Sequence, residues 1–200
     1  MRGRKARCYA FAPSQRPTDE DLADAPHALT DHEGTFLSLV LRIQPTTAYQ
    51  VTKIYEASPV NNFNTSKGKI YPLIRRLTER GLLAKQLVEG DGRGTEALLC
   101  TEEGEKAVRT WVRQIRDTHV LLDDPLRTKV QSFGLLTKEE QIAWIAEAKA
   151  MLHGKLAQLE AYRSEVDVPY KDFLHDNAVS TTRARLDWLD RMLIGIVGPH

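Results

Sequence analysis

The chain has 200 residues, of which 42% are apolar and 28% charged, and its formal net charge is +1. This composition allows one large or two small globular domains with a packed core. The balanced charge excludes a generally basic nucleic-acid coat, so a polyanion must bind at a local patch. No apolar run is long enough to span a membrane. Cys8 and Cys100 stand in different contexts, which predicts no disulfide framework and a reduced, cytoplasmic location.

Residues 1–30 are predicted to form a disordered leader, because they contain three prolines and no sustained periodicity. Their basic start also suggests a functional alternative, an arm that follows DNA phosphates.

Apolar residues at helical spacing predict a helix that starts at Asp31 and is stopped by Pro45. A second helix ends before Pro59, and a third follows within the stretch Asn64–Leu83, NTSKGKIYPLIRRLTERGLL. Short helices joined by tight connections are the layout of a helix-turn-helix with a supporting helix. The third helix has an apolar stripe made of Ile70, Leu73, Ile74 and Leu77.

The other face of this third helix is strongly basic. Five basic residues against one acid give it a net charge of +4: Lys67, Lys69, Arg75, Arg76 and Arg80 against Glu79. A helix that buries one face and exposes a concentrated positive one is expected to read DNA. An ordinary amphipathic helix with a solvated basic face fits the same stretch.

After the third helix the periodicity changes to that of strands. Two short strands, Leu82–Val88 and Thr95–Thr101, flank the glycine-rich tip EGDGRG and predict a β-hairpin. A hairpin directly after a basic helix is the wing of a winged helix. Its Arg93 is placed to reach a phosphate or the minor groove, although the glycines serve the turn whatever Arg93 contacts.

Further helices follow the hairpin. One, capped by Thr101, is predicted to continue to about His119 and to bury Val112 and Ile115. A short helix is predicted over Leu126–Phe133, ended by a glycine.

The C-terminal half is predicted to hold two long helices. A capping box at Thr137 opens the first, whose heptad seam runs for about three and a half repeats. The second begins at about Thr181. Their apolar stripes predict a dimerisation unit, with an internal helical pair as the alternative.

No enzymatic constellation is visible. The six histidines are scattered, and the chain contains neither a phosphate loop of the known spacings nor a nucleophile elbow. The sequence therefore predicts no enzyme, no catalytic residue, no metal site and no cofactor.

Three segments resemble the PadR family of transcriptional regulators. They are SKGKIYPLIRRLTERGLL, the tip EGDGRGT and the following LLCTEEGEKAV. The matching features are Ser66, Ile70-Tyr71-Pro72, Arg80-Gly81-Leu82, Gly92-Arg93-Gly94, and Thr101 with Gly104.

The resemblance implies a mainly α fold with a small β-hairpin, built as a winged helix-turn-helix domain (31–118) plus a helical dimerisation domain (119–200). It implies a ligand-responsive repressor that binds double-stranded operator DNA as a homodimer. The alternative is a winged-helix module that binds protein instead of DNA.

The DNA-binding candidates gather on the third helix and the wing. Tyr71 is either a DNA contact or a core aromatic residue, and Arg75 and Arg76 are phosphate or structural contacts. The full set is Ser66, Lys67, Lys69, Tyr71, Arg75, Arg76 and Arg93.

The resemblance also implies an effector, a small aromatic molecule held between the winged helix and the helical arm. Aromatic residues are its candidate ligands, and ordinary core packing is their alternative role. The candidates are Trp111, Phe133, Trp144 and Tyr162.

Overall fold

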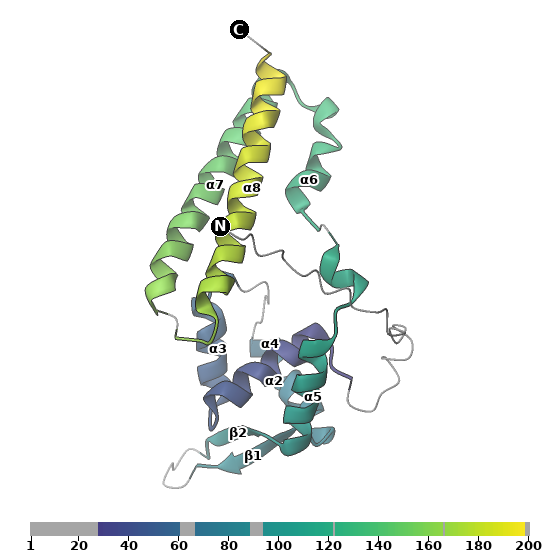
Figure 1. Cartoon of the computed structure of the whole chain (residues 1–200), viewed down its shortest axis with the longest axis vertical. Helices are drawn as coiled ribbons and strands as arrows, with labels where there is room; N and C mark the ends of the chain where they lie inside the picture. Colours follow the sequence, from purple (N-terminus) through teal and green to yellow (C-terminus); the bar gives the residue numbers. More distant parts are fainter. Residues whose placement is uncertain (1–27, 61–66, 89–93, 122, 166, 199–200) are drawn as a thin grey trace, which may run out of the picture. The chain divides into compact units, whose positions relative to one another are not determined.

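The computed structural model describes residues 28–60, 67–88, 94–121, 123–165 and 167–198 (Figure 1). Within them, the predicted mainly α fold with one small antiparallel hairpin is confirmed. In chain order the elements are α2 (Asp31–Ile43), α3 (Ala48–Ala57), α4 (Lys67–Glu79), β1 (Leu83–Leu87), β2 (Glu96–Cys100), α5 (Glu102–Arg113), η1 (Asp117–Val120), α6 (Pro125–Val130), η2 (Phe133–Leu135), α7 (Lys138–Glu165) and α8 (Lys171–Val197), where η is a 3₁₀ helix.

By its contacts the chain divides into two compact units. The first combines Met1–Thr47 with Pro72–Val120, and the second combines Ala48–Tyr71 with Leu121–His200. Helix α4 therefore begins in the second unit and ends in the first. None of the helices in the described ranges has the length and hydropathy needed to cross a lipid bilayer.

The first unit is organised around α2. Its N-terminus is fixed by a capping box, in which the Thr30 hydroxyl accepts from the Glu33 amide and the Glu33 carboxylate accepts from the Thr30 amide. Leu29 is buried, so residues 28–30 belong to the folded unit. The rest of the predicted leader, residues 1–27, lies outside the described residues. The side chains of Phe36, Leu37 and Val40 on α2 form the centre of this core.

The predicted hairpin is confirmed, although its tip, residues 89–93, lies outside the described residues. β1 pairs antiparallel with β2 in a register that sets Leu83 opposite Cys100 and Leu87 opposite Glu96. On its other side, β2 exchanges two hydrogen bonds with Thr46, through the amide and carbonyl of Leu98. These bonds attach the wing to the segment that follows α2.

The prediction for α5 was wrong at its C-terminal end. The helix stops at Arg113 because Gln114 adopts an extended conformation, and the separate turn η1 follows. Val112 and Ile115 are consequently exposed, and the buried residues come from the first two turns. Beyond this end, Arg116 donates to the Leu29 carbonyl at 2.8 Å and so connects the segment after the helix to residue 29.

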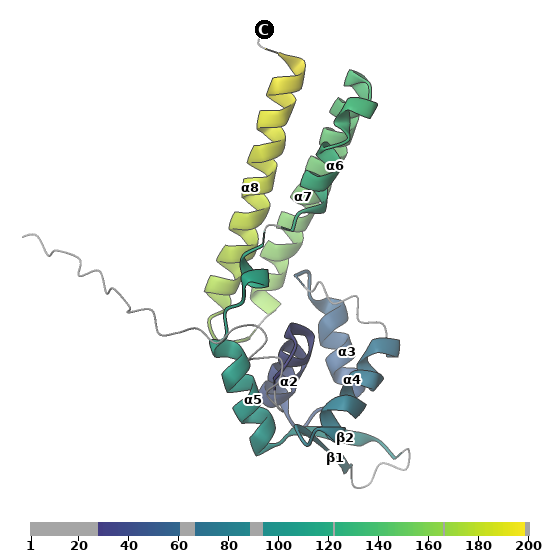
Figure 2. The same cartoon turned by 90° about the vertical axis from the view of Figure 1, so that its right-hand side faces the viewer.

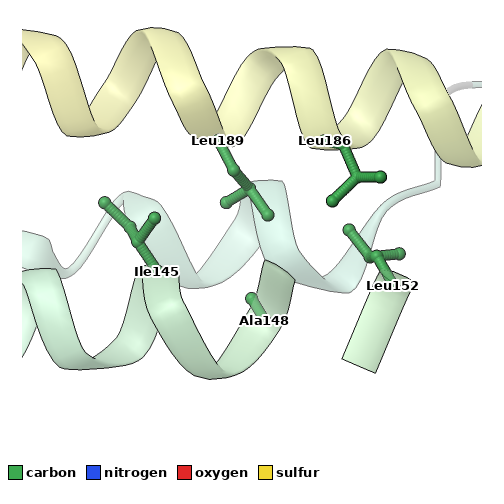
Figure 3. Packing of buried hydrophobic residues seen from close by; sticks show 5 residues of the cluster. All are labelled: Ile145, Ala148, Leu152, Leu186 and Leu189. Atoms are coloured by element: carbon green, nitrogen blue, oxygen red, sulfur yellow. The ribbon is translucent and has the colours of Figure 1, made fainter. Parts of the chain in front are cut away.

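The second unit is dominated by α7 and α8, which run side by side in both views (Figures 1 and 2). Thr137 and Glu140 form the predicted capping box of α7. Apolar side chains of the two helices point toward one another (Figure 3). This cluster consists of Ile145, Ala148, Leu152, Leu186 and Leu189, with Leu126 and Phe133 among the residues packed against it.

Two boundaries in this unit differ from the prediction. Helix α8 starts at Lys171 and not at Thr181. Its first turns expose Phe173 and Leu174, and the first buried apolar residue is Val179. Polar contacts with α7 accompany these turns, from Asp172 to Arg163 at 3.0 Å and from His175 to Glu160 at 3.5 Å. The helix predicted over Leu126–Phe133 is divided into α6 and η2, because its last turn tightens to a 3₁₀ turn.

Candidate nucleic-acid interface

Helix α4 has the two faces that its sequence predicts. Ile70, Leu73, Ile74 and Leu77 are all buried, so the apolar stripe is confirmed. Lys69 lies on the exposed side. Tyr71 is 62% exposed, which excludes it from the core and leaves its ring and hydroxyl accessible to a partner. The helix therefore presents a basic and aromatic surface from its first turns.

Three of the candidate DNA contacts cannot be placed. Ser66 and Arg93 lie outside the described residues, as does the side chain of Lys67, whose backbone begins α4. The described part of the wing carries an ion pair between Lys85 and Glu96 at 2.8 Å, which joins its two strands on the exposed side.

The arginines of α4 have different partners. Arg75 is 77% exposed and its Nε lies 3.8 Å from Glu79 one turn later, a loose surface pair. Arg76 donates through Nε to Glu33 Oε1 at 2.8 Å. Arg80 lies 3.2 Å from the other oxygen of Glu33 and also donates to the Ala28 carbonyl at 2.7 Å. Two of the five bases of the stretch are thus bound to one acid of α2.

Sequence reasoning did not identify Glu33. Its side chain is only 5% exposed, yet it carries a charge that two arginines and one backbone amide share. Burial raises the pKa of Glu33, but the Thr30 amide and the two guanidinium groups outweigh burial and hold the pKa below its ordinary value. The signal was present as Thr-x-x-Glu at residues 30–33, the pattern of a capping box.

Two of the motifs that resemble the PadR family, Arg80-Gly81-Leu82 and Thr101 with Gly104, meet at the base of the wing. The Thr101 hydroxyl donates to the Gly81 carbonyl at 2.7 Å, and the Thr101 amide donates to the Leu82 carbonyl at 3.2 Å. The same hydroxyl accepts from the Gly104 amide and so caps α5. A Cβ at Gly104 would lie 2.1 Å from the Leu82 carbonyl oxygen, so this position requires glycine.

The four aromatic effector candidates are not one cluster. Trp111 belongs to the first unit, where its ring lies against Gly34 and its indole N–H donates to Asp31 at 2.9 Å. Phe133 and Trp144 form an edge-to-face pair with ring centroids 4.9 Å apart. Tyr162 lines a different feature, an open hollow of about 470 Å³ between the end of α3 and the C-terminal part of α7.

Asp31 connects α2 to the segment after α5. It accepts from Trp111, lies 3.1 Å from His119 Nε2 and 3.9 Å from Arg116. Burial raises the pKa of Asp31, whereas the Trp111 hydrogen bond and the neighbouring His119 and Arg116 lower it, and the net pKa lies below the ordinary value. Among the described residues, no group of three histidine, cysteine or acidic side chains has the arrangement of a metal site.

Short helices followed by an antiparallel hairpin and a capped helix define a winged helix-turn-helix protein, here with a long helical pair. Residues 36–110 match the model of the Transcriptional regulator PadR-like family. This match covers the segment from α2 to α5, so the winged-helix part of the chain is similar to that family.

Solved structures share the fold over most of the chain. Bacillus subtilis PadR in complex with operator DNA is 17% identical, with a TM-score of 0.71 over 84% of this chain and 99% of that one. A PadR-like transcriptional regulator from Bacillus cereus is 16% identical, with a TM-score of 0.66 over 84% and 97%. Bacillus subtilis PadR in complex with p-coumaric acid is 15% identical, with a TM-score of 0.67 over 84% and 96%. No curated protein matches the chain by sequence.

Proposed function

We propose that the protein is a sequence-specific regulator of transcription that binds double-stranded operator DNA in the cytoplasm. The observation that carries this proposal is the surface of α4, where Lys69 and Tyr71 are exposed above a fully buried apolar stripe. A winged helix places such a helix in the major groove and its wing beside it. The family match and the relative solved with operator DNA support the same function.

The regulator acts as a homodimer through its C-terminal helices. Several large apolar side chains on α7 and α8 are exposed in the single chain, which supports a partner surface there. They include Met151, Phe173, Leu174 and Ile194. A two-fold dimer presents two recognition helices to half-sites about 34 Å apart, one turn of DNA. Light scattering after size exclusion tests this assembly, because a strict monomer at micromolar concentration contradicts it.

The regulator is a repressor that a small aromatic effector releases from DNA. One relative was solved with p-coumaric acid, which supports this class of ligand. In this chain, the hollow lined by Tyr162 offers an aromatic ring beside polar groups, and Lys155 at its edge donates to the Pro59 carbonyl at 2.9 Å. Quenching of tryptophan fluorescence by p-coumaric acid, together with release of bound DNA, is the expected result. A titration that changes neither signal contradicts this effector class.

DNA binding itself is tested by fluorescence anisotropy with a random duplex at about 50 mM salt, where non-specific attraction is strong. Binding is expected, with an affinity that falls steeply as salt rises. Replacing Lys69 with Gln should flatten the salt slope by about 0.9, the contribution of one neutralised phosphate. No binding at low salt refutes the proposal and favours a winged-helix module that binds protein.

A further inference from the structure

The charge that α4 carries in sequence is not the charge that it presents to solvent. Glu33 lies in the first turn of α2, and its carboxylate faces the C-terminal half of α4. One oxygen accepts from Arg76 Nε at 2.8 Å, and the other lies 3.2 Å from Arg80. The arginines differ in access, because Arg76 is 52% exposed and Arg80 is 25% exposed.

The position of Glu33 is fixed independently of the arginines. Its carboxylate also accepts from the Thr30 amide at 3.0 Å, and its own amide donates to the Thr30 hydroxyl. A carboxylate held by the capping box does not follow an arginine that swings toward a phosphate. Arg75, next to Arg76 in sequence, has no such anchor: its partner Glu79 is itself exposed and 3.8 Å away.

We propose that Glu33 is a positioning residue that withholds Arg76 from DNA, while Arg80 is held by both Glu33 and the Ala28 carbonyl, so that α4 offers its positive charge only from its first turns and from Arg75. This inference rests on the proposed DNA binding. Its consequence is a lower affinity for arbitrary DNA, because phosphate contacts contribute to every sequence equally. Glu33 thus raises the ratio of specific to non-specific binding without touching a base.

The size of the effect follows from the geometry. Removing the charge of Glu33 frees Arg76, which is half exposed, whereas Arg80 stays bonded to the Ala28 carbonyl. One additional neutralised phosphate steepens the slope of log K against log salt by about 0.9. The substitution Glu33→Gln is suited to this test because glutamine serves in a capping box as glutamate does, which preserves the start of α2.

The experiment measures the salt dependence of random-duplex binding by the full-length wild type and three variants. Glu33→Gln should steepen the slope by about 0.9. Adding Arg76→Gln to it should return the slope to the wild-type value, and Glu33→Asp should rescue the wild-type slope by restoring the charge. If Glu33 only stabilises the fold, Glu33→Gln weakens binding without steepening the slope. That result, or a double variant as steep as the single one, overturns the proposal.

A second measurement needs no substitution at Glu33. The Nε–H signal of Arg76 in an NMR spectrum reports its bond to Glu33 and should stay unshifted when duplex is added. A shift of that signal to a phosphate-bound position overturns the proposal. Absence of DNA binding by the wild type is a separate outcome, since it refutes the proposed function before any slope can be compared.

Discussion

The close contact at Gly104 makes a quantitative stability prediction. A Cβ there would lie 2.1 Å from the Leu82 carbonyl oxygen and 2.8 Å from the Cys100 sulfur. The Leu82 oxygen belongs to the backbone and cannot turn aside as a flexible side chain can. The start of α5 must therefore move away from the wing by more than 1 Å before the new Cβ and this oxygen reach ordinary van der Waals contact. Overpacking of this kind costs about 1–3 kcal/mol. The shift also strains the hydrogen bond from the Thr101 amide to the same carbonyl, worth about 1 kcal/mol.

Helix propensity opposes these costs, because alanine is favoured over glycine inside a helix by about 1 kcal/mol. Gly104→Ala should therefore lower the free energy of unfolding by about 2 kcal/mol, measured by urea denaturation followed by circular dichroism. Gly154→Ala is the matched control: it lies in α7 with nothing within 4 Å of its Cβ position, and it should stabilise by up to about 1 kcal/mol. If Gly104→Ala is as well tolerated as Gly154→Ala, the close approach of α5 to the wing is refuted.

Three further predictions concern titrating and hydrogen-bonding groups. Burial, together with the charge of Glu105, raises the pKa of Cys100 to about 11. In a Cys8→Ser variant, the Cys100 thiol of the folded protein should therefore react with Ellman's reagent at pH 8 about 100-fold more slowly than the same thiol in urea. Equal rates in the two states contradict this prediction. Folding lowers the pKa of Glu33 from 4.5, so the Glu33 carboxylate stabilises the folded state above pH 4.5, and this stabilisation is lost as the pH falls through the folded-state pKa. In Glu33→Gln, the urea midpoint should therefore fall less steeply on the acid side of its pH profile. A profile equal to that of the wild type contradicts this prediction. Trp111→Phe removes the donor to half-exposed Asp31 and should cost about 1 kcal/mol in the same assay, whereas no loss would mean that the bond is not formed in solution.

Much of the fold could be predicted because local signals agreed with each other. The stripe of α4, the glycine-rich hairpin and the capping box at Thr137 each combine a periodicity with a stop or start residue. The errors arose where one signal was missing. The apolar stripe of α5 continues to Ile115 in the sequence, but the helix ends at Arg113, and the hydrogen bond of the next segment, from Arg116 to the Leu29 carbonyl, joins residues 87 positions apart. The start of α8 differs from the prediction because its first turns expose Phe173 and Leu174 and bury no apolar residue before Val179.

The candidate site divides in the same way. Exposure of Lys69 and Tyr71 follows from helical periodicity, since the buried stripe fixes which side of α4 faces outward. The difference between Arg75 and Arg76 does not follow, because Arg75 pairs loosely with Glu79 of its own helix, whereas the partner of Arg76 is Glu33 of α2. Likewise, Trp111 is an aromatic residue of the kind that often contacts a ligand. In the structure its ring packs where a side chain at position 34 would lie, and its indole N–H donates to Asp31.

A count of charges along a helix therefore gives an upper limit on what the helix offers to a polyanion. Of the five bases in the third-helix stretch, two are bound to Glu33, which lies more than forty residues earlier and is itself fixed by a capping box. The same acid that starts α2 thus decides which part of α4 is positive toward solvent. For the proposed operator-binding regulator, binding energy from phosphate contacts contributes nothing to the choice of sequence. A buried acid that removes surplus positive charge from the recognition helix favours specificity at the expense of total affinity.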